Sequence, residues 1–298
     1  MASSTIASPA NAAALGAYTS LVESSTDSRD QTLVIRQVTP DIVTFSIPFT
    51  RGGLIPIGGR STAVRIPRSP KPTVTENAIQ PAPQPPAGQE GVAGSEVFVY
   101  VSTPLTKATV EALKGLGEVK WLVTPDGEHG MHIQEYVDHY PGAQPIGVER
   151  FKEKKPNIAW AGLFGPKTDG ETKTYGFEPE ISLHQVSAHV NHELTAIHHP
   201  SGTLIQADML FNLPPTEQYS RNGGIPALMK LTGSGKSMSP GGKVHDLMVN
   251  QISKDKELLK KELRPINTAK WDRIIPCHGD VIETGGRVAW DQVWAKFA

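Results

Sequence analysis

The order of apolar patterns along the chain is the feature that most limits how it can fold. Between residues 33 and 101 the apolar residues gather in short runs typical of strands, and Val43, Phe45 and Ile47 alternate with polar neighbours as in a half-buried strand. From residue 106 onward, strand-like runs alternate with segments whose apolar residues recur at helical spacing. This order predicts two face-to-face sheets with helices outside, an α/β sandwich.

The mixed part of the chain carries start and stop signals for individual elements. Gly115 and Gly117 end a helix that begins near Thr106, and Pro141-Gly142 ends a helix that begins at His129. The same periodicities predict strands over 119–123, 193–199, 203–207 and 273–275, one long amphipathic helix over 244–259, and a closing helix over 290–297. Loops at the ends of these strands are the places to look for functional side chains.

Two segments fall outside this pattern. Residues 1–28 are rich in Ala, Ser and Thr and show little periodicity, so we expect a flexible N-terminal tail. Residues 67–94 contain seven prolines and predict an extended surface insertion. Strands on both sides of the insertion indicate an enlarged hairpin loop, so we expect residues 29–298 to form a single domain.

Composition and charge exclude several classes of function. Lys plus Arg number 29 and Asp plus Glu number 30, a net charge of −1, which argues against a nucleic-acid partner. The single cysteine, Cys277, rules out a disulfide framework within the chain and every multi-cysteine zinc motif. The apolar runs are too short to span a membrane. The first 28 residues contain no Lys or Arg, whereas a signal peptide needs a basic segment and a transit peptide needs arginines. We therefore expect a cytoplasmic protein.

Histidines and one aspartate occupy positions where a metal site could form. All ten histidines lie between His129 and His278. Four candidate ligands lie next to predicted strands: His129, His189, Asp208 and His278. Turns at one edge of a sheet bring such residues together as metal ligands. Each one alone is better explained by a local hydrogen bond at a strand end, so the prediction depends on all four together.

Two shorter motifs do not hold. Residues 233–237 read Gly-Ser-Gly-Lys-Ser, like the end of a phosphate-binding loop, but Lys230 stands where that loop needs its first glycine. His192-Glu193 opens like a helical zinc-protease motif, but Ala196 occupies the place of the second histidine. Neither nucleotide binding nor a helical zinc protease is expected.

Over about residues 95–290 the chain resembles the metallo-β-lactamase fold family in three spacings. That family's His-x-His-x-Asp-His motif precedes a helix that stops at Pro-Gly, and aligning the stop on Pro141-Gly142 places the last histidine on His129. His189 lies 19 residues before Asp208, as the family's third-motif histidine precedes its bridging aspartate, and residues 276–279 match the family's Pro-x-His-Gly turn. The resemblance implies an α+β fold, a four-layer αβ/βα sandwich.

The chain also resembles, over about residues 40–290, one branch of this fold that is frequent in fungi and bacteria and has an eroded first motif. Four marks carry this likeness: Phe49-Thr50-Arg51-Gly52-Gly53, Ser102-Thr103-Pro104-Leu105-Thr106, Val123-Thr124-Pro125-Asp126 and Pro200-Ser201-Gly202-Thr203-Leu204. The branch implies the fold and no particular substrate.

The first motif departs from the pattern of the family. Its four positions hold Thr124, Asp126, Glu128 and His129, so both early histidines are missing and Glu replaces Asp. The family's first metal site would keep only His189, with Asp126 as a weak substitute. A full two-metal centre is therefore not expected.

The resemblance implies that the second metal site survives. Its ligands would be Glu128, His129 and His278, with Asp208 bridging. The implied cofactor is a single divalent metal, with zinc as the first choice. Iron and manganese are alternatives, because they suit a carboxylate-rich site.

These ligands favour a metal-dependent hydrolase of a small ester, thioester or phosphoester, since a bound cation polarises the reacting oxygen and activates water. Asp208 would orient the water, and His189 would be a ligand or a general base. His132 is either a replacement ligand or a half-buried helix histidine. Two alternatives stay open: a degenerate protein that binds a small molecule or partner without turnover, and a mononuclear iron oxygenase. In each case we expect a small-molecule ligand and no membrane partner.

Overall fold

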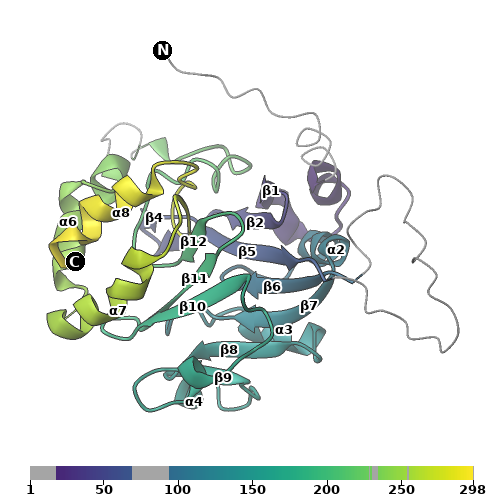
Figure 1. Cartoon of the computed structure of the whole chain (residues 1–298). Helices are drawn as coiled ribbons and strands as arrows, with labels where there is room; N and C mark the ends of the chain where they lie inside the picture. Colours follow the sequence, from purple (N-terminus) through teal and green to yellow (C-terminus); the bar gives the residue numbers. More distant parts are fainter. Residues whose placement is uncertain (1–17, 69–93, 228, 230–233, 254, 298) are drawn as a thin grey trace, which may run out of the picture.

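The computed structural model describes residues 18–68, 94–227, 229, 234–253 and 255–297 (Figure 1). The predicted tail at 1–28 lies outside these ranges as far as residue 17, and most of the predicted insertion at 67–94 also lies outside them. Residues 18–23 form a helix whose Val22 is 5% exposed, so the ordered chain begins before residue 29. Within the described ranges, no helix is long and apolar enough to cross a bilayer.

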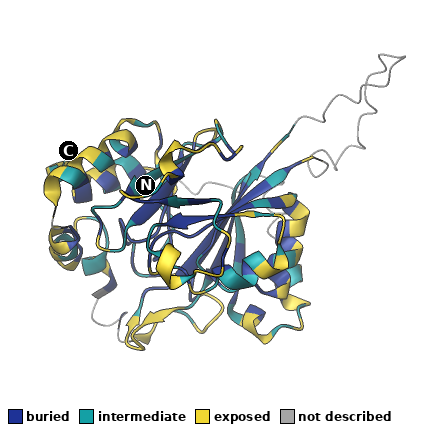
Figure 2. Ribbon diagram, turned by 90° about the horizontal axis from the view of Figure 1, so that it is seen from below, coloured by how far each residue is buried: buried dark blue, intermediate teal, exposed yellow. Residues whose placement is uncertain are grey.

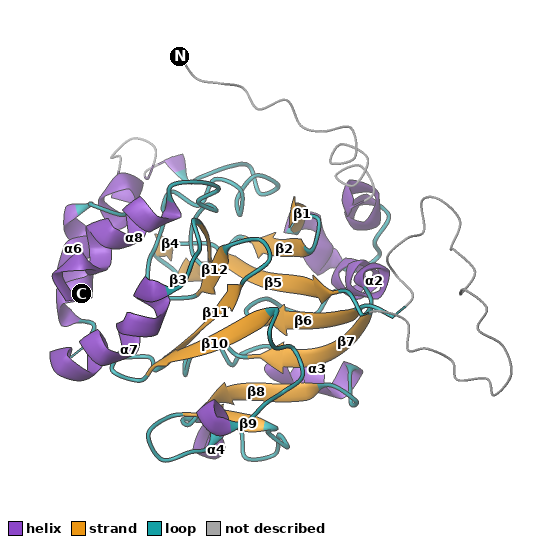
Figure 3. Cartoon of the chain, viewed as in Figure 1, coloured by secondary structure: helices purple, strands orange, loops and turns teal. Residues whose placement is uncertain are grey.

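The strands of the described chain form two main sheets and one short hairpin (Figures 1 and 3). The seven-stranded sheet contains, in spatial order, β1 (Val34–Thr39), β2 (Ile42–Ile47), β5 (Gly59–Ile66), β6 (Glu96–Tyr100), β7 (Glu118–Val123), β8 (Gln144–Val148) and β9 (Gly162–Phe164). The four-stranded sheet contains β10 (Ile181–Val186), β11 (Glu193–His198), β12 (Thr203–Gln206) and β13 (Arg273–Pro276). Strands β3 (Thr50–Arg51) and β4 (Ile55–Pro56) form the hairpin.

Strand β6 shows how the sequence produces the layers. Its side chains alternate between two cores, with Phe98 and Tyr100 packed between the sheets and Val97 and Val99 packed on the other face. All four are 0% exposed. A strand buried on both faces requires a continuous apolar run, which is what residues 97–101 provide.

Helices cover the outer faces of both sheets, and the buried residues lie along the sheets and the inner helix faces (Figure 2). On the seven-stranded sheet lie α2 (Lys107–Leu116) and α3 (Ile133–His139), which bury Leu113 and Tyr136. On the four-stranded sheet lie α6 (Lys243–Gln251), α7 (Lys256–Thr268) and α8 (Gly286–Trp294), which share one core. The layers confirm the predicted α+β fold, a four-layer αβ/βα sandwich.

Several predicted element boundaries change. The single helix expected over 244–259 is wrong, because Asp255 accepts the Leu258 N–H at 2.9 Å and starts a new helix, α7. The helix expected from His129 begins only at Ile133, and the closing helix α8 already begins at Gly286. Strands β8, β9 and β10 and the short helix α4 (Phe151–Lys154) are additional elements that the periodicity did not predict.

Candidate metal centre

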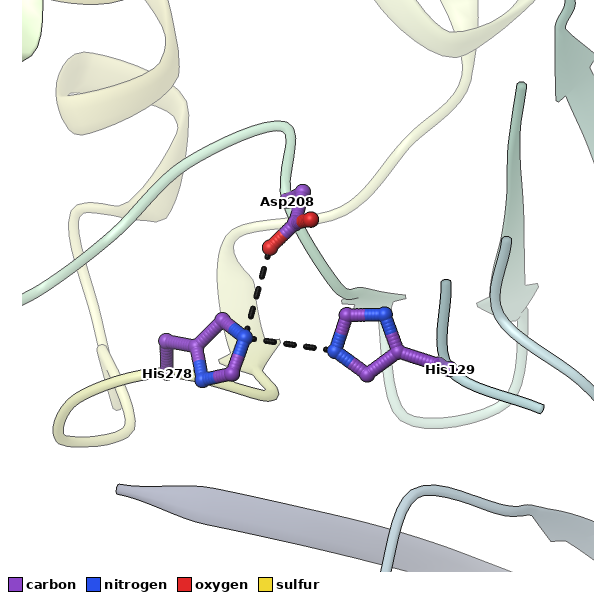
Figure 4. A group of neighbouring side chains, drawn as sticks. All are labelled: His129, Asp208 and His278. Atoms are coloured by element: carbon purple, nitrogen blue, oxygen red, sulfur yellow. Dashed lines mark hydrogen bonds and ion pairs between the residues drawn. The ribbon is translucent and has the colours of Figure 1, made fainter. Parts of the chain in front are cut away.

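Three loops at strand ends bring His129, Asp208 and His278 together (Figure 4). Strands β12 and β13 are parallel neighbours, with Gln206 opposite Pro276 at their ends. Asp208 lies two residues after the end of β12, and His278 lies two residues after the end of β13. His129 comes from the loop after β7, in the other sheet. The cluster therefore lies where the ends of both sheets meet.

The distances within the cluster are short. Nε2 of His278 lies 3.2 Å from Nε2 of His129 and 3.3 Å from Oδ1 of Asp208 (Figure 4). One ligand atom from each of the three residues lies within 4.8 Å of the other two. Asp208 and His278 are 5% and 4% exposed, so water does little to screen these atoms.

Hydrogen bonds fix which nitrogen of each imidazole faces the cluster. Nδ1 of His278 lies 2.6 Å from the Gly58 carbonyl oxygen, which can only accept, so this nitrogen carries the proton. Nδ1 of His129 likewise donates to Oδ2 of Asp126 at 2.9 Å. In both neutral rings Nε2 therefore presents a lone pair to the centre, which is the tautomer that metal-bound histidines adopt.

The three facing atoms consist of two lone-pair nitrogens and one carboxylate oxygen. Oδ1 of Asp208 is buried and has no hydrogen-bond partner among the residues that the structure describes. Three acceptors that converge without a donor repel one another unless a cation lies between them. These three ligand atoms therefore fit a divalent metal such as zinc, which binds two histidines and a carboxylate and keeps an open position.

The pKa values of the cluster residues also show that its carboxylates favour a positive charge nearby. Burial alone would lower the pKa of His129, but the neighbouring carboxylates, foremost Asp126, raise it to about 10. Burial would raise the pKa of Asp208, but the surrounding imidazoles, foremost His278, hold it well below its usual range. A proton on His129 is thus the alternative to a metal in balancing these carboxylates.

A pocket of about 190 Å³ opens over the cluster and is lined by all three of its residues. Apolar side chains form much of the wall: Ile47, Phe49, Ile57 and Met131. Arg51, Glu128 and His132 also line it. A small molecule could therefore reach the candidate ligands directly.

Solved structures with this arrangement of elements include metallo-β-lactamases. The chain aligns with FIM-1 of Pseudomonas aeruginosa, in its mono-zinc form, at a TM-score of 0.50 and 10% identity, over 89% of this chain and 94% of that chain. It aligns with the Erythrobacter litoralis enzyme at 0.51 and 12%, over 89% and 96%. A flavoprotein of Thermotoga maritima gives 0.53 and 11%, over 89% of this chain and 61% of that chain. The chain has a metallo-β-lactamase-like fold.

No family model and no curated protein matches the sequence, so the three-dimensional arrangement alone carries this likeness. The cluster combines one residue from the loop after β7 with two residues that follow β12 and β13. The sequence predicted six ligands, and the structure brings three of them together, His129, Asp208 and His278.

Asp126 does not join the cluster but holds the loop that carries His129. Its Oδ1 accepts the backbone N–H groups of Glu128 at 2.7 Å and His129 at 2.9 Å. Its Oδ2 accepts Nδ1–H of His129. Asp126 is 0% exposed, so these three bonds use a buried carboxylate as a positioning group and not as a ligand.

Glu128 is also outside the cluster, contrary to its expected role as a ligand. Its Oε1 lies 3.0 Å from Nζ of Lys154 and 3.9 Å from Nη1 of Arg150, and its side chain is 53% exposed. His132 is outside as well, since its Nδ1 lies 2.9 Å from Oε1 of Glu135. The replacement-ligand reading of His132 has no geometric support.

His189 is buried near the cluster without belonging to it. Its Nδ1 accepts the Asn191 backbone N–H at 3.1 Å, so the neutral ring carries its proton on Nε2. Burial lowers the pKa of His189, although the charge of Asp208 opposes this. His189 does not line the pocket, and its roles as a ligand or a general base stay predictions.

Two residues that the sequence did not single out fix Asp208. Asn191 donates from Nδ2 to Oδ2 of Asp208 at 2.6 Å. The buried carboxylate of Glu193 accepts the backbone N–H groups of Ala207 at 2.6 Å and Asp208 at 3.1 Å. Glu193 appeared in the sequence only as part of a rejected zinc-protease motif, which gave no signal for this role.

A buried arginine supports the turn that carries His278. Nη1 of Arg60 donates to the carbonyl oxygens of Pro276 at 2.7 Å and Gly279 at 2.6 Å, on either side of His278. Arg60 is 0% exposed and its charge is balanced by Glu217 at 3.2 Å. The turn is therefore held by a charged clamp from strand β5, far from it in sequence.

Proposed function

We propose that the protein is a metal-dependent hydrolase with one divalent metal that acts on a small ester, thioester or phosphoester. The observation that carries this proposal is the convergence of three lone-pair atoms, from His129, Asp208 and His278, in the wall of an open pocket. Hydrolase chemistry is common for a single cation with an open position.

The three cluster residues would hold the metal, which when bound polarises the substrate oxygen and lowers the pKa of water. Asp126 and Gly58 keep the two rings in the tautomer that the metal needs, through bonds of 2.9 and 2.6 Å. Asp208 lines the pocket and orients the attacking water.

A mononuclear iron oxygenase is the second candidate. Two histidines and one carboxylate with open positions are the ligand set of non-haem iron(II) oxygenases, and the cluster has this composition. The hydrolase remains the better supported proposal, since no group in the described part of the pocket is specific to oxygen chemistry.

The deciding experiment is metal analysis of the purified protein and of a variant in which His129 and His278 are both Ala. We expect one equivalent of zinc in the wild type and none in the variant. A chelator should lower the melting temperature of the wild type only, since a ligand at ~1,000 times its Kd stabilises by about 4 kcal/mol. The variant with Ala at the exposed His139 and His199 is the matched control and should keep the metal.

Activity is then measured with p-nitrophenyl acetate, acetyl thiocholine and bis-p-nitrophenyl phosphate on the zinc-loaded protein. Hydrolysis of one of these, lost in the double variant of His129 and His278, supports the proposal. Protein that cannot be loaded with zinc, iron or manganese and ignores chelator contradicts it. That result favours a degenerate protein that binds without turnover, with the cluster balanced by a proton on His129. Iron loading with oxygen uptake and no hydrolysis favours the oxygenase.

A further inference from the structure

The β3–β4 hairpin places an arginine in the wall of the pocket. Arg51 pairs with Ile55 across the hairpin, and alternation along the chain puts Phe49 on the same face as Arg51. Both Phe49 and Arg51 line the pocket. Thr50 lies on the opposite face, with its hydroxyl 3.1 Å from that of Tyr219. One face of the hairpin therefore lines the pocket, and the opposite face packs against Tyr219.

The base of this hairpin is tied to a metal ligand. The Phe49 carbonyl oxygen accepts the backbone N–H groups of Ile57 and Gly58, each at 3.0 Å, and the Tyr219 hydroxyl at 3.0 Å. The Gly58 carbonyl oxygen in turn accepts Nδ1–H of His278. The Phe49 ring is stacked on that imidazole, with centroids 6.3 Å apart. Arg51, two residues further along, lines the same pocket as this imidazole.

In the described part of the chain, the exposed charges that line the pocket have partners, except that of Arg51. Glu128 is compensated by Lys154, and His132 lies against Glu135. The Arg51 side chain is exposed and forms no ion pair with any residue in the described part of the chain. A guanidinium beside an apolar wall and a metal site is suited to bind an anionic group in two hydrogen bonds.

We propose, on the basis of the proposed hydrolase function, that the substrate is an organic anion whose carboxylate or phosphate binds Arg51. A short apolar segment would separate this anion from the reacting carbonyl and contact Phe49, Ile47 and Ile57. These three apolar side chains line the same pocket as Arg51 and the cluster.

The test compares charged and neutral esters of matched reactivity on zinc-loaded wild type and Arg51→Gln. One pair, 4-carboxyphenyl butyrate and phenyl butyrate, carries the anion on the leaving group. The other pair, phenyl hydrogen adipate and phenyl hexanoate, carries it on the acyl group. We expect at least a tenfold preference in kcat/KM for the charged member of one pair, which identifies the side that carries the anion. In Arg51→Gln that preference should vanish.

The matched control is Arg264→Gln, which removes an exposed arginine of α7 and should keep the preference. Equal rates on charged and neutral esters, or a preference that survives Arg51→Gln, would overturn the inference but leave the hydrolase proposal standing. If the wild type hydrolyses no ester, calorimetry with the stable analogues 4-butoxybenzoate and 4-butoxybenzamide decides. Tighter binding of the benzoate, lost in Arg51→Gln, would support the anion site without the reaction. Equal binding would overturn it.

Discussion

Replacing Asp126 with Asn should weaken metal binding while leaving the fold almost unchanged. The amide keeps one oxygen, which can still accept the backbone N–H groups of Glu128 and His129. The other oxygen, 2.9 Å from Nδ1 of His129, becomes an NH₂ group that can only donate. Nδ1 must then accept, so the ring proton moves to Nε2, which is the atom that faces the metal.

The size of the effect follows from that tautomer change. Hydrogen-bond partners of metal-bound histidines are worth about 10–100-fold in metal affinity, and we expect the upper end because the new proton occupies the ligand atom itself. A hundredfold loss corresponds to about 2.8 kcal/mol less stabilisation by zinc. In the metal-free variant the displaced proton points at Nε2 of His278, 3.2 Å away, so the bonding network stays satisfied. The metal-free variant should also be less stable than the metal-free wild type, because the new amide side chain carries no charge to raise the pKa of the buried His129.

The assay is a zinc titration against a chromophoric chelator, combined with urea unfolding in the presence and absence of zinc. Asp291→Asn, which changes an exposed aspartate of α8, is the control and should behave as the wild type. A zinc affinity of Asp126→Asn within twofold of the wild type would refute the reasoning, since it would mean that the Asp126–His129 bond does not set the tautomer.

Three further predictions test the supporting structure. Arg60→Met should lower the free energy of unfolding by about 2–4 kcal/mol in urea, because it leaves the buried carbonyls of Pro276 and Gly279 without a donor, while Glu217 keeps its ion pair with Arg36; a loss below 1 kcal/mol would contradict the clamp. Gly279→Ala should cost about 2–4 kcal/mol and reduce zinc content, because φ is 94° there and a Cβ would collide with the Asn212 carbonyl. Burial lowers the pKa of His245 from 6.5 to about 4, and its Nε2 accepts the Phe211 N–H at 3.1 Å. As pH falls, His245 becomes protonated in the unfolded chain before it does in the folded protein. The contribution of neutral His245 to the free energy of unfolding is therefore complete above pH 6.5 and is lost as pH falls toward 4. His245→Gln should flatten that slope, and an unchanged slope would show that other groups cause it.

The sequence predicted the layers and the places of the three facing residues for a common reason. Strand and helix periods record which faces are buried, and Asp208 and His278 follow parallel neighbours directly, so their meeting depends on local spacing and sheet order. His129 was placed through the stop at Pro141-Gly142, although α3 itself begins four residues later than expected. Small errors at helix ends therefore did not disturb the position of the loop.

The roles of the neighbouring carboxylates were not predictable in the same way. Asp126 and Glu128 have similar chemistry and lie two residues apart, yet one accepts buried N–H groups and the other pairs with Lys154, 26 residues further along. Which side chain turns inward is decided by cations and amides from other elements. Spacing within one motif contains no information about those partners, and Arg60 and Glu193 were missed for the same reason.

The bond between Gly58 and His278 joins residues 220 positions apart. During synthesis the segment around Gly58 leaves the ribosome and can begin to fold long before His278 exists. The ligand geometry thus depends on a contact that closes only when the four-stranded sheet docks on the first one, and contacts of such long separation form late. Metal uptake would then report completion of folding, and a chaperone or metal donor would meet a competent site only on a nearly finished molecule.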